Sequence, residues 1–216
     1  MLFVFPIAKG RTMNVVLRYP KPAGERLPET VKSPKQQVAE FLGVPLPEEF
    51  DLGNEDVQLL DYESGIKEVI RERRPWIIIE RCVAVQSVHA NGKSRYAVWG
   101  VTTFTEQMVS GHFPGNPKVP FVDLAKMIAQ LAIVAAALQA GNPALAPIGV
   151  GSDGSSADAK DLIRVPATVL AHVPVNGYKM GLCTFGESHV YVDAEQVGTV
   201  TGIRYLMRPS PELPFT

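Results

Sequence analysis

A single histidine, His112, lies in a segment made mostly of glycine and proline, Gly111–Pro117. Neutral imidazole is a competent general base near pH 7, and glycine and proline together fix a tight turn. An apolar helical run, residues 121–138, follows at once. The pattern predicts one acid/base group held at the edge of an apolar binding space. The alternative is a histidine that only hydrogen-bonds within its turn.

The expected helix carries two charged residues near its start, Asp123 and Lys126. Their spacing of three places them on one face of a helix. In one interpretation either residue donates a proton, Lys126 doing so if burial disfavours its charged form. In the other they form a structural ion pair that closes the site, since burying one charge alone is costly.

Strand-like segments surround the helix, which we expect over Val122–Gln139 with a stop at Gly141-Asn142-Pro143. A helix that is apolar on nearly all sides must be enclosed by other elements. We therefore predict an α+β fold in which one antiparallel sheet curls around a central helix. The expected strands are 76–85, 94–104, 146–150, 167–173, 179–187 and 195–207, with 189–192 joined to one of the last two.

The first 63 residues are expected to form an extension of short strands and helices. Runs at 2–5 and 13–19 predict a hairpin, and helices are expected over 54–62 and 64–73. The strongest local signal is Ser33-Pro34-Lys35-Gln36, a capping box with proline at the first helical position. That helix should end near Leu42, with Gly43 as its stop. The extension is expected to cover a sheet edge, cap the binding space or bind a partner.

Composition limits the classes of partner. The 216 residues have a net charge of −1, which gives no reason to expect nucleic acid or an anionic membrane. The longest apolar run, Met127–Leu138, is shorter than the roughly 20 residues of a membrane helix, and the N-terminus lacks signal-peptide features. We expect a soluble cytoplasmic protein with no metal site, whose two cysteines, Cys82 and Cys183, are buried and reduced.

Several motifs resemble one known family. The Gly111–Pro117 sequence matches a G-H-F-P-G-x-P signature, with Pro120, Ala129 and Gln130 in register behind it. The segment 73–81, Arg-Arg-Pro-Trp-Ile-Ile-Ile-Glu-Arg, looks like a family strand, R-x-P-F-L-L-V-D-R. Residues 64–208 thus resemble the hotdog-fold 3-hydroxyacyl-[acyl-carrier-protein] dehydratases. This resemblance divides the chain into an extension (1–63), a hotdog domain (64–208) and a tail (209–216).

The resemblance implies an activity, dehydration of a 3-hydroxyacyl thioester in fatty acid or polyketide-type lipid synthesis. His112 corresponds to the base that removes the proton α to the carbonyl. Phe113, Gly115, Phe121 and Gln130 fall at substrate-binding positions. The partner is an acyl carrier protein or a coenzyme A thioester, and the phosphopantetheine belongs to the substrate, so no other cofactor is implied. A homodimer or larger homo-oligomer is expected, because the family's catalytic pair is split across subunits.

The chain departs from the family at two positions. Lys126 occupies the place of the helix Glu or Asp that protonates the departing hydroxyl, and Phe121 replaces a glycine. Asp123 or Lys126 would have to supply the acid. Two other functions stay open: a non-catalytic acyl-thioester-binding or partner subunit, and a hotdog thioesterase in which Asp123 activates water.

Overall fold

The computed structural model describes residues 15–17, 32–52, 56–70, 77–88, 92–111, 115–142, 144–156 and 163–209. The helices are α1 (Pro34–Leu42), a π-helical turn (Tyr62–Ile66) that continues into α2 (Lys67–Val69), and α3 (Phe121–Ala140). The strands are β1 (Val15–Leu17), β2 (Asp56–Asp61), β3 (Arg81–Val88), β4 (Ser94–Phe104), β5 (Leu145–Gly151), β6 (Gly154–Ser156), β7 (Ala167–Lys179), β8 (Leu182–Phe185), β9 (Ser188–Val192), β10 (Glu195–Thr201) and β11 (Arg204–Pro209).

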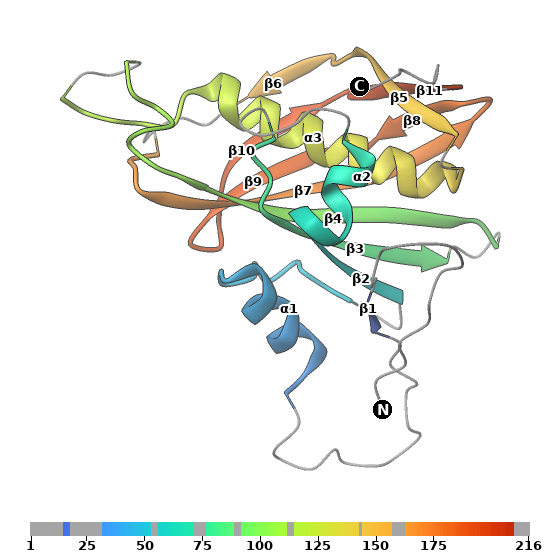
Figure 1. Ribbon diagram of the computed structural model, residues 1–216, viewed down its shortest axis with the longest axis horizontal. Coiled ribbons are helices and arrows are strands. Elements are labelled where there is room, and N and C mark those ends of the chain that lie inside the picture. Colours follow the sequence, from blue (N-terminus) through green and yellow to red (C-terminus); the bar gives the residue numbers. More distant parts are fainter. Residues whose placement is uncertain are drawn as a thin grey trace.

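The described strands form one antiparallel sheet that curls around α3 (Figure 1). Its order is β1-β2-β3-β4-β7-β8-β11-β5, and β9, β10 and β6 branch from β7. The sheet's inner face and α3 enclose the main hydrophobic core. This is an α+β hotdog fold, as the sequence pattern predicted.

Helix α3 is the centre of that core. Its 20 residues begin after Pro120 and end at Gly141, which has a left-handed φ of 60°. Among the described residues it is the one helix long and apolar enough to cross a membrane by length and composition. In this fold the sheet encloses it, and Met127, Leu131 and Val134 are fully buried. The predicted helix, Val122–Gln139, is therefore confirmed to within one residue at each end.

The N-terminal layer, which we define as α1 with residues 43–50, covers the outer face of the sheet. It lies on the opposite side of β2, β3 and β4 from α3 (Figure 1). Val38 and Leu42 are fully buried against strand residues, and the ring of Phe50 meets Trp99 edge-on at 4.9 Å between centroids. Arg81 fixes the end of α1 by donating to the Phe41 carbonyl at 2.7 Å. The extension thus contributes in two ways, because the N-terminal layer covers a sheet face while strands β1 and β2 lie along the edge of β3.

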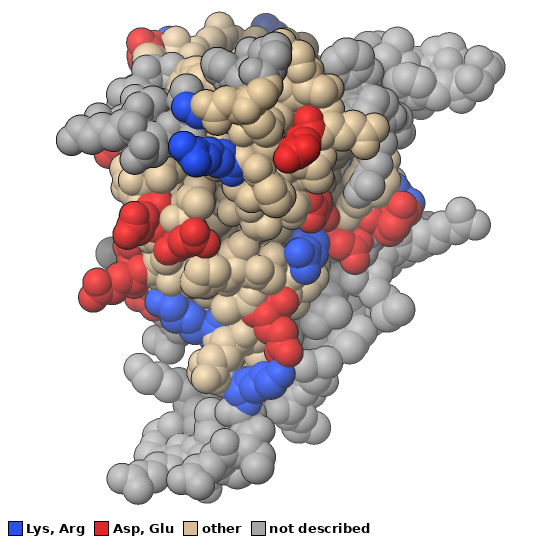
Figure 2. Space-filling view, turned by 90° about the vertical axis from the view of Figure 1, so that its left-hand side faces the viewer, with Lys and Arg blue, Asp and Glu red and all other residues tan. Residues whose placement is uncertain are grey.

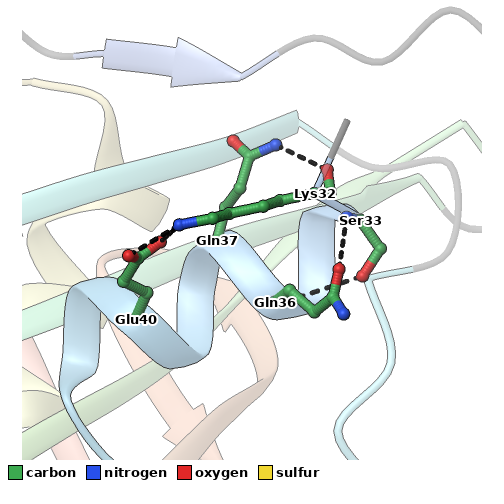
Figure 3. A network of polar contacts seen from close by, with 5 residues as sticks. All are labelled: Lys32, Ser33, Gln36, Gln37 and Glu40. Atoms are coloured by element: carbon green, nitrogen blue, oxygen red, sulfur yellow. Dashed lines mark hydrogen bonds and ion pairs between the residues drawn. The ribbon is translucent and has the colours of Figure 1, made fainter. Parts of the chain in front are cut away.

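The predicted capping box of α1 is present (Figure 3). The Ser33 hydroxyl accepts from the Gln36 backbone N–H at 3.2 Å, and the Gln36 side chain accepts from the Ser33 N–H at 2.8 Å. Lys32 lies along the helix and pairs with Glu40 at 2.7 Å. Gly43 ends the helix with a φ of 73°. Local sequence alone therefore determined both ends of this helix.

The segment 54–62, which we predicted as a helix, contains strand β2 instead. It pairs with β3 along its whole length and with β1 at residues 57–59. Residues 2–5, the expected partner of the 13–19 run, lie outside the described residues. Val57 packs into the outer core and Leu60 into the inner core. Burial on both faces puts the apolar residues three apart, a spacing that imitates a helix.

The expected strand 195–207 is two strands, and 189–192 is a separate strand, β9. The break between β10 and β11 falls at Gly202, whose φ is 68°. A Cβ there would lie 2.4 Å from the Asp153 side chain. Glycine therefore allows the chain to turn beside the loop that precedes β6.

Charges of both signs are interspersed on the end of the molecule that Figure 2 shows, which is the left-hand side of Figure 1. Acidic and basic side chains lie next to one another on this face, so that neither sign of charge covers it alone. This distribution agrees with the overall net charge of −1. Long-range electrostatic attraction of a highly charged polymer is therefore not a property of this face.

Candidate functional site

Two glycines frame the histidine turn. Gly111 has a φ of 93° and Gly115 a φ of 78°, values that favour glycine because other residues lack low-energy conformations there. His112 and Phe113 lie outside the described residues. Gly115 itself is exposed to solvent.

A two-residue ladder holds the exit of the turn. The Val119 N–H donates to the Ile163 carbonyl at 2.8 Å, and the Val165 N–H donates to the Pro117 carbonyl at 3.3 Å. Between them, Lys118 and Arg164 form an antiparallel bridge. The end of the turn is therefore fixed relative to the start of β7, which lies at the centre of the sheet.

Helix α3 starts immediately after this ladder. Its N-cap, Pro120, makes no side-chain cap, so early backbone N–H groups are available at the helix start. Phe121 is the first helical residue and is 38 % exposed, and Val122 is 62 % exposed. Phe121 has an ordinary helical backbone, so the replacement of a family glycine introduces no strain of that kind here.

Asp123 and Lys126 occupy the first two turns of α3, and both are half-buried. Asp123 complements the positive end of the helix dipole. Both side chains belong to the described part of the chain, and no ion pair joins them there. The structure places both residues at the start of α3, where the sequence analysis expected them.

Gln130 is a buried structural link. It is 2 % exposed, and its side-chain oxygen accepts from the Ile78 N–H at 3.0 Å. The Ile78 carbonyl in turn accepts from the Thr102 hydroxyl at 3.0 Å. These bonds join α3, the segment before β3, and β4. This contact of Gln130 is thus with the backbone of the segment before β3.

An apolar cavity of about 460 Å³ adjoins the same helix. Ala125, Ile128 and Ala129 form its helix wall, and Gly149–Ser152 and Ile203–Tyr205 form the strand wall. The Tyr205 hydroxyl donates to the Ala129 carbonyl at 3.1 Å. The small side chains of two alanines leave this space open, beside residues that neighbour Lys126 in the helix.

A second group of residues, two histidines and a tryptophan, lies on the outer face. No motif in the sequence indicated that they meet. Trp99, His172 and His189 are direct cross-strand neighbours on β4, β7 and β9. The rings of Trp99 and His172 stack at 4.0 Å between centroids and 17° between planes. Burial lowers the pKa of His172 to about 4, aided by His189 and opposed by Glu49. His172 and His189 are strand residues, as expected.

A larger cavity, of about 820 Å³, lies between the N-terminal layer and the β9–β10 turn. Tyr191, Lys118 and Arg164 contribute to its lining. The two cysteines are free and buried, as predicted, and burial raises the pKa of both thiols. Among the described residues, no three His, Cys, Asp or Glu side chains are placed to hold a metal ion.

No protein-family model matches the chain. Three similar curated proteins are 3-hydroxyacyl-[acyl-carrier-protein] dehydratases FabZ. Those of Thermoanaerobacter sp., Caldicellulosiruptor bescii and Bacillus licheniformis are 31 %, 34 % and 35 % identical over 72, 74 and 77 residues. The matches cover 33 %, 34 % and 36 % of this chain and 47 %, 49 % and 49 % of the relatives. The chain thus spans about half the length of the curated relatives it matches.

Two solved structures are similar at lower identity. The dehydratase heterocomplex ApeI:P from Xenorhabdus doucetiae aligns with a TM-score of 0.49 and 11 % identity, over 68 % of this chain and 91 % of that chain. The PaaI protein from the phenylacetic acid degradation operon of E. coli aligns with a TM-score of 0.38 and 15 % identity, over 53 % and 75 %. The chain has a hotdog fold, and its partial similarity to FabZ supports a relationship to the hotdog dehydratases.

Proposed function

We propose that this protein is a hydro-lyase that eliminates water from a 3-hydroxyacyl thioester to give a trans-2-enoyl product. The observation that carries the proposal is the signature segment, which has glycines of positive φ at positions 111 and 115. Backbone hydrogen bonds at Pro117 and Val119 hold the end of this segment directly before the start of a buried helix. That helix brings a polar pair and an apolar cavity to the same region. The partial similarity to FabZ supports the same class of reaction.

In the proposed reaction, neutral His112 removes the proton α to the thioester carbonyl. The electrons of that C–H bond form the double bond, and the C–O bond to the 3-hydroxyl breaks. Asp123 or Lys126 gives the leaving hydroxyl its proton, so that water departs. Backbone N–H groups at the start of α3, such as that of Phe121, polarise the carbonyl as its oxygen gains charge.

The proposed substrate reaches the site on an acyl carrier protein or coenzyme A, whose phosphopantetheine is part of the substrate. The cavity beside Ala125 and Ala129 is the proposed space for the acyl chain. Among the described strands β5 pairs only with β11, so one edge of β5 is open to a second copy of the chain. We propose a homodimer through that edge, in the cytoplasm, where unpaired cysteines are the rule.

Hydration of an enoyl thioester, the reverse reaction, tests the proposal. Crotonyl and longer enoyl thioesters are offered to the purified protein, and loss of absorbance of the conjugated double bond is followed. We expect turnover in the natural protein and a loss of about 100-fold or more in His112→Ala. Absence of turnover at every chain length in a correctly folded protein would refute the proposal.

A second candidate function is a non-catalytic acyl-thioester-binding subunit, or one that pairs with an active partner. The residue that favours it is Lys126 on α3, because the resemblance to the dehydratases aligns this position with a carboxylate. Equal binding of acyl thioester by the natural protein and His112→Ala, without turnover, would favour it. A thioesterase is the third candidate, resting on half-buried Asp123, and release of free thiol from acyl-coenzyme A distinguishes it.

A further inference from the structure

A row of apolar side chains lies exposed on the outer face of β5, β11 and β8. Ile148 pairs with Leu206, and Leu206 pairs with Leu182, so the three are direct neighbours across adjacent strands. Tyr205 and Met207, which flank Leu206, and Cys183, which follows Leu182, belong instead to the main core. Ile148 is 54 % exposed and Leu182 is 36 % exposed. The row therefore faces solvent.

On the other half of the same sheet face, a comparable group of apolar side chains is covered by another element of the chain. There, Val83, Val101 and Trp99 are at most 4 % exposed because the N-terminal layer covers them. Helix α1 lies at the end of the molecule away from β5 and β11 (Figure 1). One half of the outer face thus packs against a helix of this chain, whereas the other half has a similar apolar row over which the described residues place no helix.

Basic side chains border the exposed row. Arg204 and Arg208 precede and follow Leu206 by two residues on β11, and so share its face. Lys179 pairs with Leu182 across the β7–β8 hairpin. Asp153 forms an ion pair with Arg204, and Lys179 and Arg208 are exposed. We call these six residues, Ile148, Leu182, Leu206, Lys179, Arg204 and Arg208, the basic-rimmed strip.

We propose that the basic-rimmed strip binds an acidic amphipathic helix of another protein. Three adjacent strands span about 10 Å, which is the diameter of one α-helix. Apolar residues of such a helix would cover Ile148, Leu206 and Leu182, and its acidic flanks would meet the three cations. The inference goes beyond the proposed reaction and does not depend on His112.

Charge complementarity distinguishes this occupant from a second copy of the chain. In a two-fold contact through this face, Lys179 and Arg208 would meet a surface of the same positive charge. Helix α1, with Lys35 and Glu40 as its charged residues, is not an acidic helix. An acidic partner therefore matches the strip better than either the same face or α1 of another copy.

Two synthetic 18-residue peptides test the proposal against full-length, isotope-labelled protein. One repeats leucine at helical spacing among glutamates, and the other has lysine in place of every glutamate. We expect the acidic peptide to shift the amide resonances of β5, β8 and β11, and the basic peptide to leave them unchanged. Double charge reversal, Lys179→Glu with Arg208→Glu, should weaken binding about five-fold or more, as should a rise to 300 mM salt.

The control variant is Lys32→Glu, an exposed charge reversal just before α1, which should bind like the natural protein. Equal binding of both peptides, or shifts confined to other strands, would overturn the proposal. So would a homodimer in sedimentation that the double reversal strengthens, because a second copy would then occupy the strip. Strip-dependent binding to phosphatidylserine vesicles without peptide binding would likewise reject a protein partner.

Discussion

The side-chain oxygen of Gln130 accepts a hydrogen bond from the backbone N–H of Ile78, 52 residues earlier in the chain, at 3.0 Å. Replacing Gln130 with leucine leaves that N–H without its partner in the interior. We expect Gln130→Leu to lower the free energy of unfolding by about 1–3 kcal/mol, measured by urea denaturation.

The matched control is Gln107→Leu, an exposed glutamine in the turn after β4. It should change the unfolding free energy by less than about 0.5 kcal/mol. Should Gln130 instead orient a catalytic group, Gln130→Leu would keep full stability while the turnover number falls. That result would contradict the structural role assigned to Gln130.

Gly100 provides the closest approach between β4 and the central helix. A Cβ built on it would lie 2.4 Å from Cδ2 of Leu131 and 3.2 Å from Cβ of Cys82. Gly100→Ala should therefore push α3 away from the sheet and cost about 1–3 kcal/mol of stability. In Gly154→Ala, the nearest atom to the new methyl group is 3.8 Å away, so thermal unfolding of that control should be nearly unchanged.

Gly100 also illustrates what sequence reasoning could and could not reach. The pattern around it predicted β4 with its observed ends, because its alternation and its turn signal are local. The capping box predicted α1 for the same reason. At the two ends of the signature segment, Gly111 and Gly115 have positive φ values, which favour the glycines that the sequence places there.

Features that depend on distant partners were missed. Strand β2 imitates a helix because Val57 and Leu60 are buried in different cores on its two faces. The stacking of His172 on Trp99 arises from register between strands separated by more than 70 residues, which periodicity does not encode.

His172 should make the protein less stable in mild acid. Its pKa in the folded state is lowered by burial to about 4, below the ordinary value of 6.5. The unfolded chain therefore binds a proton that the folded state refuses, and stability falls as pH drops from about 6.5 to about 4. At pH 5 the loss amounts to at most about 2 kcal/mol.

His172→Phe tests this pH dependence, because phenylalanine retains a ring over Trp99 without titrating. Urea midpoints are compared at pH 7.5 and pH 5 for the natural protein and the variant. The natural protein should lose more stability on acidification than His172→Phe does. An equal loss in both proteins would mean that other groups, and not His172, determine the acid sensitivity.

The capping box makes a separate prediction about α1. Ser33→Ala removes the acceptor for the Gln36 N–H and should destabilise the helix by about 1 kcal/mol. Amide hydrogen exchange should then accelerate in residues 34–42, while α3 stays protected. Ser33→Asp keeps an acceptor at the N-cap and should restore slow exchange. Faster exchange in both variants would show that the hydroxyl itself is not the stabilising group.

Lys126→Glu distinguishes the chemical interpretations of α3. The substitution places a carboxylate on the second turn of a half-buried helix face, where it can donate a proton to a departing hydroxyl. If the natural protein is a dehydratase that lost its acid, enoyl-thioester hydration should rise about 100-fold or more.

If Lys126 is itself the acid, Lys126→Glu should alter the pH profile of hydration and lower the turnover number. Lys126→Arg should then abolish turnover. Asp123→Asn is the complementary test, because it removes the other proposed proton donor and leaves Lys126 in place. Unchanged hydration in every one of these variants would place the proton donor outside α3, and that would contradict the mechanism proposed for this helix.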